Sequence, residues 1–153
     1  MKWLIAMCAL VMMAAPVQAD EIDDYIDLLR QDARGMMRMV VSEVMDDLTP
    51  DEDKAFWKVY DKYEKEVMKI GRVRTELIRE FAENYFDIDD HLADHIATQS
   101  LHLQVKRTNL RKDYYRKFRY AVGAKKATRF MQLDLVVSRI IDLQVSSELP
   151  LIE

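Results

Sequence analysis

Leu48-Thr49-Pro50-Asp51-Glu52 is the stretch that decides the fold, because it opens the longest helical pattern in the chain. Thr49 can cap a helix, and Pro50 suits the first helical position because its missing N–H would have no partner there. Glu52 stands three residues after Thr49, from where its side chain can reach back to the cap. The stretch therefore predicts that a helix begins at Pro50.

The residues that follow place apolar side chains on one stripe at helical spacing, with oppositely charged residues three or four apart on the other side. This pattern predicts a helix from Pro50 to about Phe86, roughly 50 Å long at about 1.5 Å per residue. Gly71 is a point where it could bend. The predicted stripe consists of Phe56, Tyr60, Tyr63, Val67, Ile70, Leu77, Ile78, Phe81 and Tyr85.

Three further helical patterns flank this one. The first covers residues 23–47, the second begins after a cap at Asp87 or Asp89 and runs to about Tyr120, and the last covers 124–147 after a stop at Val122-Gly123. Inward positions are expected at Leu92, Ile96, Leu103, Leu110, Tyr114 and Phe118, and then at Phe130, Leu133, Val137, Ile140 and Ile141. No stretch has the alternation of a strand.

The predicted fold class is therefore all-α, with about four helices. The helices after Pro50 and after Asp89 are joined by a short connection, so we expect a long antiparallel hairpin with the other two helices flanking it. Two long rods enclose a limited core, and pairing with a second copy would bury more apolar surface. We therefore expect a homodimer.

Residues 1–19 have the three-part layout of a cleavable export signal. Met1-Lys2 is a short positive region, Trp3 to Val17 is an apolar run, and Ala19 is the expected last residue removed. The run is shorter than the roughly 20 residues that span a bilayer. We expect a periplasmic protein with one domain, residues 20–153, and no stable membrane anchor after cleavage.

Cysteine usage agrees with this. The chain has one cysteine, Cys8, which would be removed with the signal, so the mature protein would have neither disulfides nor thiol chemistry. No other nucleophile stands in a suitable motif, no glycine-rich phosphate loop is present, and carboxylates lie on helix faces. We therefore expect a protein that is not an enzyme.

Charge is unevenly distributed along the chain. Fifteen acidic and seven basic residues lie between Asp20 and Glu66, whereas ten basic residues and a single acid, Asp113, lie between Lys106 and Arg129. The basic stretch also contains tyrosines, but export argues against nucleic acid. Two interpretations remain open: a surface for acidic or unfolded protein partners, or charges that pair with the acidic half of the protein. The residues predicted to contact a partner are Phe56, Trp57, Tyr60, Arg111, Lys112, Tyr115 and Arg116.

Histidines suggest a second kind of site. His91 and His95 are one helical turn apart, the spacing at which two imidazoles can hold Zn²⁺ or Cu²⁺, and Asp87 or Asp94 could add an oxygen. His102 lies on the same stripe but about 10 Å further along, at about 1.5 Å per residue. The other interpretation is a solvated polar flank, since a lone pair of histidines is a weak signal.

These features resemble the periplasmic LTxxQ-motif stress proteins of the Spy/CpxP type, and also an uncharacterised group of exported proteobacterial proteins. The resemblance rests on Leu48 to Glu52 with Phe56-Trp57 and Tyr60, and on later segments. The later segments are Tyr114 to Phe118, Ala124 to Ala127, Arg129-Phe130 and Gln132. The motif's fifth position holds Glu52 instead of glutamine.

The resemblance implies a cradle-shaped antiparallel helical dimer that binds unfolded proteins or modulates an envelope sensor kinase. The sequence thus predicts an exported interaction protein, a chaperone or envelope-stress modulator without a cofactor. The alternative is a periplasmic zinc or copper sensor or buffer that uses His91 and His95. A structural envelope protein with one fixed partner is a third hypothesis.

Overall fold

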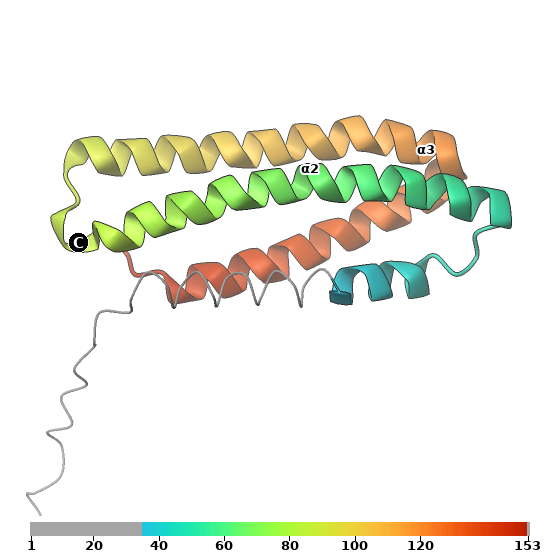
Figure 1. The fold of residues 1–153 in the computed structure, drawn as a ribbon, viewed down its shortest axis with the longest axis horizontal. Coiled ribbons are helices and arrows are strands. Elements are labelled where there is room, and N and C mark those ends of the chain that lie inside the picture. Colours follow the sequence, from blue (N-terminus) through green and yellow to red (C-terminus); the bar gives the residue numbers. More distant parts are fainter. Residues whose placement is uncertain (1–34, 153) are drawn as a thin grey trace, which may run out of the picture.

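The computed structural model describes residues 35–152, and every regular element in this range is helical. A helix covers 35–44, α2 covers Pro50–Glu83, a short 3-10 turn η1 covers Tyr85–Asp87, and α3 covers Asp90–Glu148 (Figure 1). The all-α prediction is confirmed for these residues. The predicted export signal and the start of the first predicted helix lie outside the described residues.

The helix start predicted at Thr49 is confirmed in detail. The Glu52 backbone N–H donates to Thr49 Oγ1 at 3.3 Å, and the Thr49 backbone N–H donates to Glu52 Oε2 at 2.9 Å. Pro50 is the first helical residue. This reciprocal cap pairs two backbone N–H groups that the helix itself leaves without partners.

The end of α2 differs from the prediction. The helix ends at Glu83, three residues before the predicted end at Phe86, and is continuous through Gly71. Asn84 ends it by donating its side-chain amide to the carbonyl of Glu80 at 2.8 Å, a bond that competes with continuation of the helix. Asp89 then caps α3, because its Oδ1 accepts the N–H of Leu92 at 2.8 Å.

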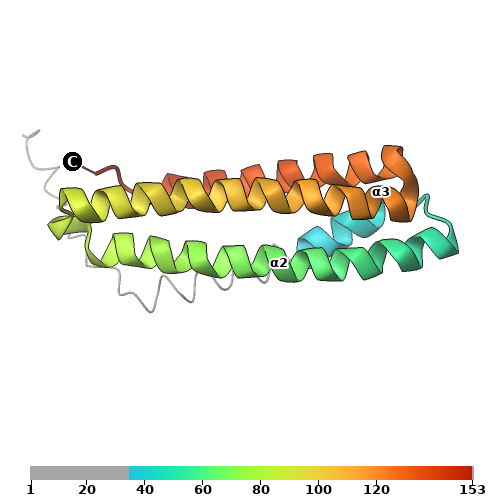
Figure 2. The same cartoon turned by 90° about the horizontal axis from the view of Figure 1, so that it is seen from above.

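Gly123 divides α3 into two arms, residues 90–122 and residues 124–148. Its φ of 79° and ψ of 165° are not helical, and such a combination is accessible essentially to glycine alone. The stop predicted at Val122-Gly123 is therefore confirmed. Both views show the chain turning back here, so that the second arm runs beside the first (Figures 1 and 2). Throughout, these are called the first arm and the second arm.

The helices form one elongated bundle, in which α2 and the first arm lie side by side (Figures 1 and 2). The helix over 35–44 is tied to α2 by an ion pair between Arg38 and Asp61 at 3.0 Å. The segment that follows it is tied to the second arm by an ion pair between Arg129 and Asp47 at 2.8 Å. Residues 35–49 therefore bridge α2 and the second arm.

An aromatic cluster forms the main core near the Gly123 end. Phe56 of α2, Phe118 of the first arm and Phe130 of the second arm are fully buried, with ring centroids 4.4 to 5.3 Å apart. Each ring contributes about 1.5–3 kcal/mol by burial. The same cluster contains Val41, Met45, Tyr60, Tyr63, Tyr114, Val122 and Ala127. A smaller cluster of Ile70, Leu77 and Leu103 lies further along the rod.

One predicted inward position is wrong. Ile140 of the second arm is exposed, together with Val136 and Leu143. Ile140 follows the buried Asp134 by six residues, which at about 100° per residue turns it about 120° away from the buried side. The buried side of the second arm therefore holds the polar side chain of Asp134, whereas the apolar periodicity predicts that the aliphatic side chain of Ile140 lies there.

Candidate functional site

The predicted partner-binding residues do not share one surface. Phe56 and Tyr60 belong to the aromatic core, where they are 0% and 2% exposed, so they are unavailable to a partner while the protein is folded. Their prediction as contact residues is wrong, because α3 and the helix over 35–44 cover the side of α2 on which they lie. Of these two covering elements, α3 is distant from them in the sequence.

Trp57 lies at the edge of this core and is half-buried. The guanidinium of Arg38 stands over its ring at 4.6 Å, and the indole Nε1 donates to Asp53 Oδ1 at 2.8 Å. Met39 and Glu64 line a shallow depression beside it. One edge of Trp57 is thus open to a partner, but its polar atom and one ring face are already engaged.

The four predicted residues of the first arm also divide. Lys112 and Arg116 are exposed, whereas Tyr115 is half-buried with its hydroxyl 3.5 Å from Thr128 Oγ1. Arg111 points inward and bonds to Asp134. Of the seven predicted contact residues, Lys112 and Arg116 are exposed, and Trp57, Arg111 and Tyr115 are partly exposed.

The outer face of α3 is the side of both arms that points away from α2. Contacts of Tyr115 with Thr128 and of Arg111 with Ser138 fix the register of the two arms. In that register, helical spacing places four basic residues together on the half of this face nearest Gly123. This basic half consists of Lys112, Arg116, Arg119 and Lys125.

Most of the charge on the basic half is unpaired. Within residues 35–152, no carboxylate lies at ion-pair distance from Lys112, Arg119 or Lys125. Arg116 pairs with Asp113 one turn before it on the first arm, and both side chains are exposed. Exposed pairs of this kind contribute little. The basic half therefore has an excess of positive charge facing solvent.

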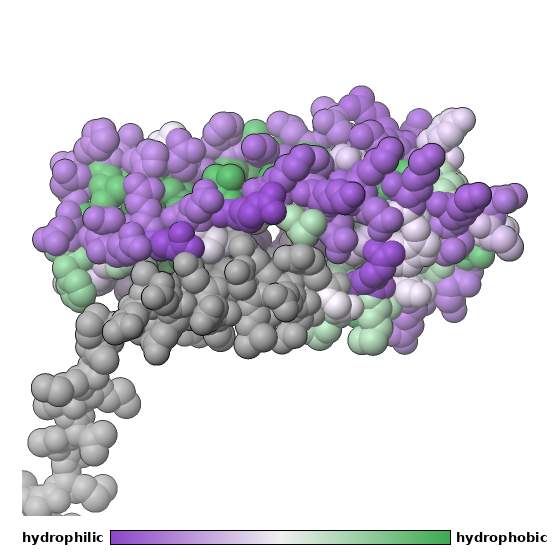
Figure 3. Space-filling model, viewed as in Figure 1, coloured by the Kyte–Doolittle hydropathy of each residue, from purple (hydrophilic) through white to green (hydrophobic). Residues whose placement is uncertain are grey.

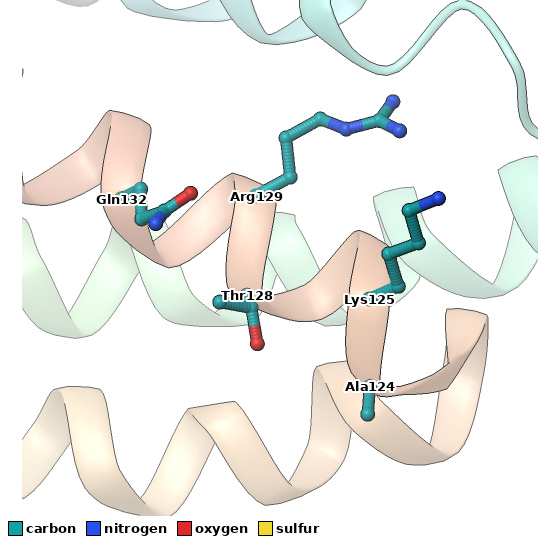
Figure 4. A pocket seen from close by; sticks show the side chains of 5 residues that line it. All are labelled: Ala124, Lys125, Thr128, Arg129 and Gln132. Carbon is teal, nitrogen blue, oxygen red and sulfur yellow. The ribbon is translucent and has the colours of Figure 1, made fainter.

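A shallow depression of about 450 Å³ lies on the second arm directly after Gly123. Ala124, Lys125, Thr128, Arg129 and Gln132 line it, and Figure 4 shows Thr128 pointing away from the direction taken by Lys125 and Arg129. The Arg129 guanidinium is already bonded to Asp47. Lys125 is the cation of the depression that is available to a ligand.

The other half of the outer face carries exposed apolar side chains, with the exposed Arg139 between Val136 and Leu143 on the second arm. Leu101 and Val105 of the first arm, and Val136 and Leu143 of the second, are more than half exposed. The register brings Leu101 level with Leu143. The face seen in Figure 3 is, by comparison, mostly hydrophilic with isolated hydrophobic patches. The outer face thus consists of a basic half near Gly123 and a second half further along the arms. We call Leu101, Val105, Val136 and Leu143 its apolar half throughout.

Several other basic residues of this stretch have internal partners. Lys126 donates to Glu52 Oε2 at 2.7 Å, and this hydrogen bond lowers the pKa of the Glu52 carboxyl. The Arg129 guanidinium likewise lowers the pKa of Asp47. Pairing with the acidic half of the protein is therefore observed for Lys126 and Arg129, whereas other basic residues of the stretch face solvent.

A polar cluster inside the bundle joins its three long segments. It consists of Tyr63 of α2, Arg107 and Arg111 of the first arm, and Asp134 and Ser138 of the second arm. Asp134 is 3% exposed and accepts from the Tyr63 hydroxyl at 2.9 Å, from Arg111 Nε at 2.7 Å and from Arg107 Nη2 at 3.1 Å. Ser138 Oγ accepts from Arg111 at 2.7 Å and from Arg107 at 3.3 Å.

Burial and charge interactions within the polar cluster shift the pKa values of its members. Burial, followed by the negative charge of Asp134, raises the pKa of the Tyr63 hydroxyl well above its usual range. Burial alone would lower the pKa of Arg111, but its hydrogen bond and charge interaction with Asp134 raise it overall. Tyr63 therefore stays protonated and Arg111 stays charged at neutral pH.

Sequence reasoning missed Asp134 and Ser138 as members of this cluster. The available signal was that Asp134 falls on the apolar stripe of the second arm, four residues after Phe130. A carboxylate at such a position predicts a buried partner, because an unpaired buried charge is costly. Which arginines would supply the partner depends on the register of the two arms, which the sequence leaves open.

His91, His95 and His102 are all exposed on the first arm. His95 Nε2 lies 3.6 Å from Glu80 Oε2 of α2. Among residues 35–152, no group of three or more histidine, cysteine, aspartate or glutamate side chains is arranged to hold a metal ion. Among the described residues, the Glu80 carboxylate thus lies near His95, but no third side chain is arranged with His91 and His95 to hold a metal ion.

Two further observations complete the description of the surface. In the part of the chain that the structure describes, no helix combines the length and apolar character needed to cross a bilayer. No family model, curated protein or solved structure matches the chain.

Proposed function

We propose that this chain is an exported periplasmic interaction protein that binds acidic or unfolded protein segments through the basic half of the outer face of α3. The observation that carries the proposal is the set of three cations, Lys112, Arg119 and Lys125, that face solvent without a carboxylate partner among residues 35–152. Such a surface attracts acidic segments over distances of about one Debye length.

The resemblance to LTxxQ-motif proteins of the Spy/CpxP type supports the same proposal, since it implies a chaperone or envelope-stress modulator. The described surface also supports a binding role, because its two depressions are shallow and open. A shallow basic surface lets a client bind without a rearrangement of the bundle. We propose no enzymatic activity.

We further propose that the functional unit is a homodimer of long antiparallel helical hairpins. Support comes from the apolar half of the outer face, where Leu101, Val105, Val136 and Leu143 are exposed. Exposed apolar side chains gathered on one face are typical of surfaces that bind another protein. The basic half would then remain free for a client.

A role as a zinc or copper sensor stays a prediction for His91 and His95. The carboxylate beside His95 comes from Glu80, at 3.6 Å, and would have to exchange this contact for metal coordination. Structural zinc sites take four ligands. We therefore place partner binding first.

The client proposal is tested with reversed charges on the basic half. The triple variant Lys112→Glu/Arg119→Glu/Lys125→Glu should weaken binding of a reduced, carboxymethylated α-lactalbumin probe by about tenfold or more at low salt, since like charges then face each other. Fluorescence anisotropy of the labelled probe measures the change. Wild-type binding should also weaken as salt is added.

The matched control is Lys58→Glu/Lys62→Glu/Lys65→Glu, which makes the same change of net charge on exposed positions of α2. Its affinity for the probe should stay within about twofold of the wild-type affinity, because this variant differs from wild type in net charge but not in the basic half. Equal losses in both triple variants would show that net charge alone acts, and no binding by folded wild-type protein would remove the proposal.

A further inference from the structure

The polar cluster carries more positive than negative charge. Two guanidinium groups share one carboxylate, and Asp134 is the one acid of residues 35–152 at ion-pair distance from either arginine. The arginine side chains are only 18% and 20% exposed. A net positive charge therefore lies near the inside of the bundle, where water screens it poorly.

The same arginines have N–H donors without acceptors. A guanidinium carries five such donors. Arg107 donates through Nη2, and its Nε is buried without a partner. Arg111 donates through Nε and Nη2, so Nη1 of neither arginine has an acceptor in the described part of the chain. Buried polar atoms without partners are rare in folded proteins.

Neither hydroxyl group of the cluster accepts from Arg107 Nε or from an Nη1 atom of the two arginines. The Tyr63 hydroxyl donates to Asp134, and Ser138 Oγ donates to the Asp134 carbonyl at 2.7 Å while accepting from both arginines. What the cluster lacks is negative charge with acceptor atoms. A cation or a donor group would add to the excess, whereas an oxyanion would remove it.

We infer that Arg107 and Arg111 form a binding site for one oxyanion, a carboxylate or phosphate group, reached from solvent at the exposed edges of the two guanidinium groups. The two residues stand one helical turn apart on the first arm, so their side chains are neighbours. A guanidinium group binds carboxylate and phosphate oxygens through strong, charge-assisted N–H···O bonds. Asp134 and Ser138 hold both guanidinium groups in position from the opposite side.

This site is distinct from the basic half of the outer face. The basic half uses exposed lysines and Arg119 and would bind through long-range attraction. The arginine site uses fixed donors and would take a single group. Its test therefore does not depend on whether the chain binds clients.

The direct test follows the side-chain Nε–Hε signals of Arg107 and Arg111 by NMR in the full mature protein. Inorganic phosphate, acetate and chloride are titrated separately at equal ionic strength. We expect saturable shifts of both signals with phosphate, with acetate or with both, and these outcomes assign the site to phosphate, to carboxylate or to either group. Signals that move no more than in chloride would overturn the inference.

A variant comparison tests the same site by thermal unfolding. Arg107→Gln is compared with Lys106→Gln, which removes the same charge from the adjacent exposed position. The anion that shifts the NMR signals should raise the melting temperature of wild type and of Lys106→Gln by about 4 °C at tenfold excess over its dissociation constant. Arg107→Gln should show less than half of that rise.

Equal rises in all three proteins would overturn the inference. If Arg107→Gln does not fold, Arg107→Lys takes its place, since it keeps the charge but lacks Nε and the planar fork. Its rise should also be less than half that of wild type. If the melting temperature of Arg107→Lys rises as much as that of wild type, the anion stabilises the protein through positive charge alone.

Discussion

Asp134 connects three helical segments through one carboxylate. Its two oxygens accept from α2 and from two arginines of the first arm, while its own backbone belongs to the second arm. Burying a carboxylate without partners costs free energy, and this cost is offset only when all of its partners are present. The polar cluster therefore specifies the register of the arms in a way that the surrounding apolar contacts do not.

Asp134→Asn should destabilise the protein by about 2–3 kcal/mol, somewhat below the 3–5 kcal/mol typical of a broken buried pair, because the arginines are partly exposed. The change leaves two guanidinium groups without a counter-charge. Urea unfolding measures it. Asp113→Asn, which removes an exposed carboxylate bonded to Arg116, is the matched control and should cost under about 1 kcal/mol. Similar losses in both variants would contradict a special role for Asp134.

At the scale of elements, Gly123 decides that α3 is two arms rather than one rod. Its backbone lies in a region that side-chain-bearing residues rarely adopt, and the chain turns back there (Figure 1). A methyl group at this position would meet no heavy atom within 4 Å. The requirement for glycine is therefore one of backbone conformation and not of space.

Gly123→Ala should destabilise the protein by about 1–3 kcal/mol through backbone strain alone. Thermal or urea unfolding followed by circular dichroism checks this. Gly35→Ala is the control, because that glycine also has open space around it and no positive φ, so the change should be neutral or slightly stabilising. A neutral Gly123→Ala would mean that the turn relaxes into another conformation.

At the scale of the whole molecule, the outer face of α3 separates two kinds of surface. Its basic half lies near the Gly123 turn, and its apolar half lies further along the arms. The aromatic core lies at the same end as the basic half, whereas the far end of the bundle has the smaller cluster of Ile70, Leu77 and Leu103. A partner at the apolar half would add buried surface where the core is smallest.

The proposed homodimer predicts a mass near twice that of the chain by sedimentation equilibrium at micromolar concentration. The double variant Leu101→Ser/Leu143→Ser should raise the dimer dissociation constant at least about tenfold, which corresponds to about 1.4 kcal/mol. Tyr120→Ser is the control, because this side chain is 96% exposed at the turn end, away from the apolar half. A monomeric wild type at high concentration would contradict the dimer.

The local structure was predictable because it depends on neighbouring residues. Thr49, Pro50 and Glu52 make the start of α2 recognisable from their order alone, and Gly123 marks the end of the first arm. Periodic apolar side chains likewise identified most of the core, including Phe118 and Phe130. The end of α2 was placed three residues late because Asn84 competes for the Glu80 carbonyl, a choice that apolar periodicity does not register.

The sequence by itself thus determined an all-helical chain, its breaks and an excess of basic residues between Lys106 and Arg129. Only the tertiary structure decided which of those residues face solvent. Arg111 turns inward to Asp134, Lys126 closes onto Glu52, and Lys112 stays exposed, although all three lie in one basic run. The physical reason is that a charged side chain pairs with an oppositely charged residue that lies next to it in the folded protein. Which residue lies there depends on the packing of helices that are distant in the sequence.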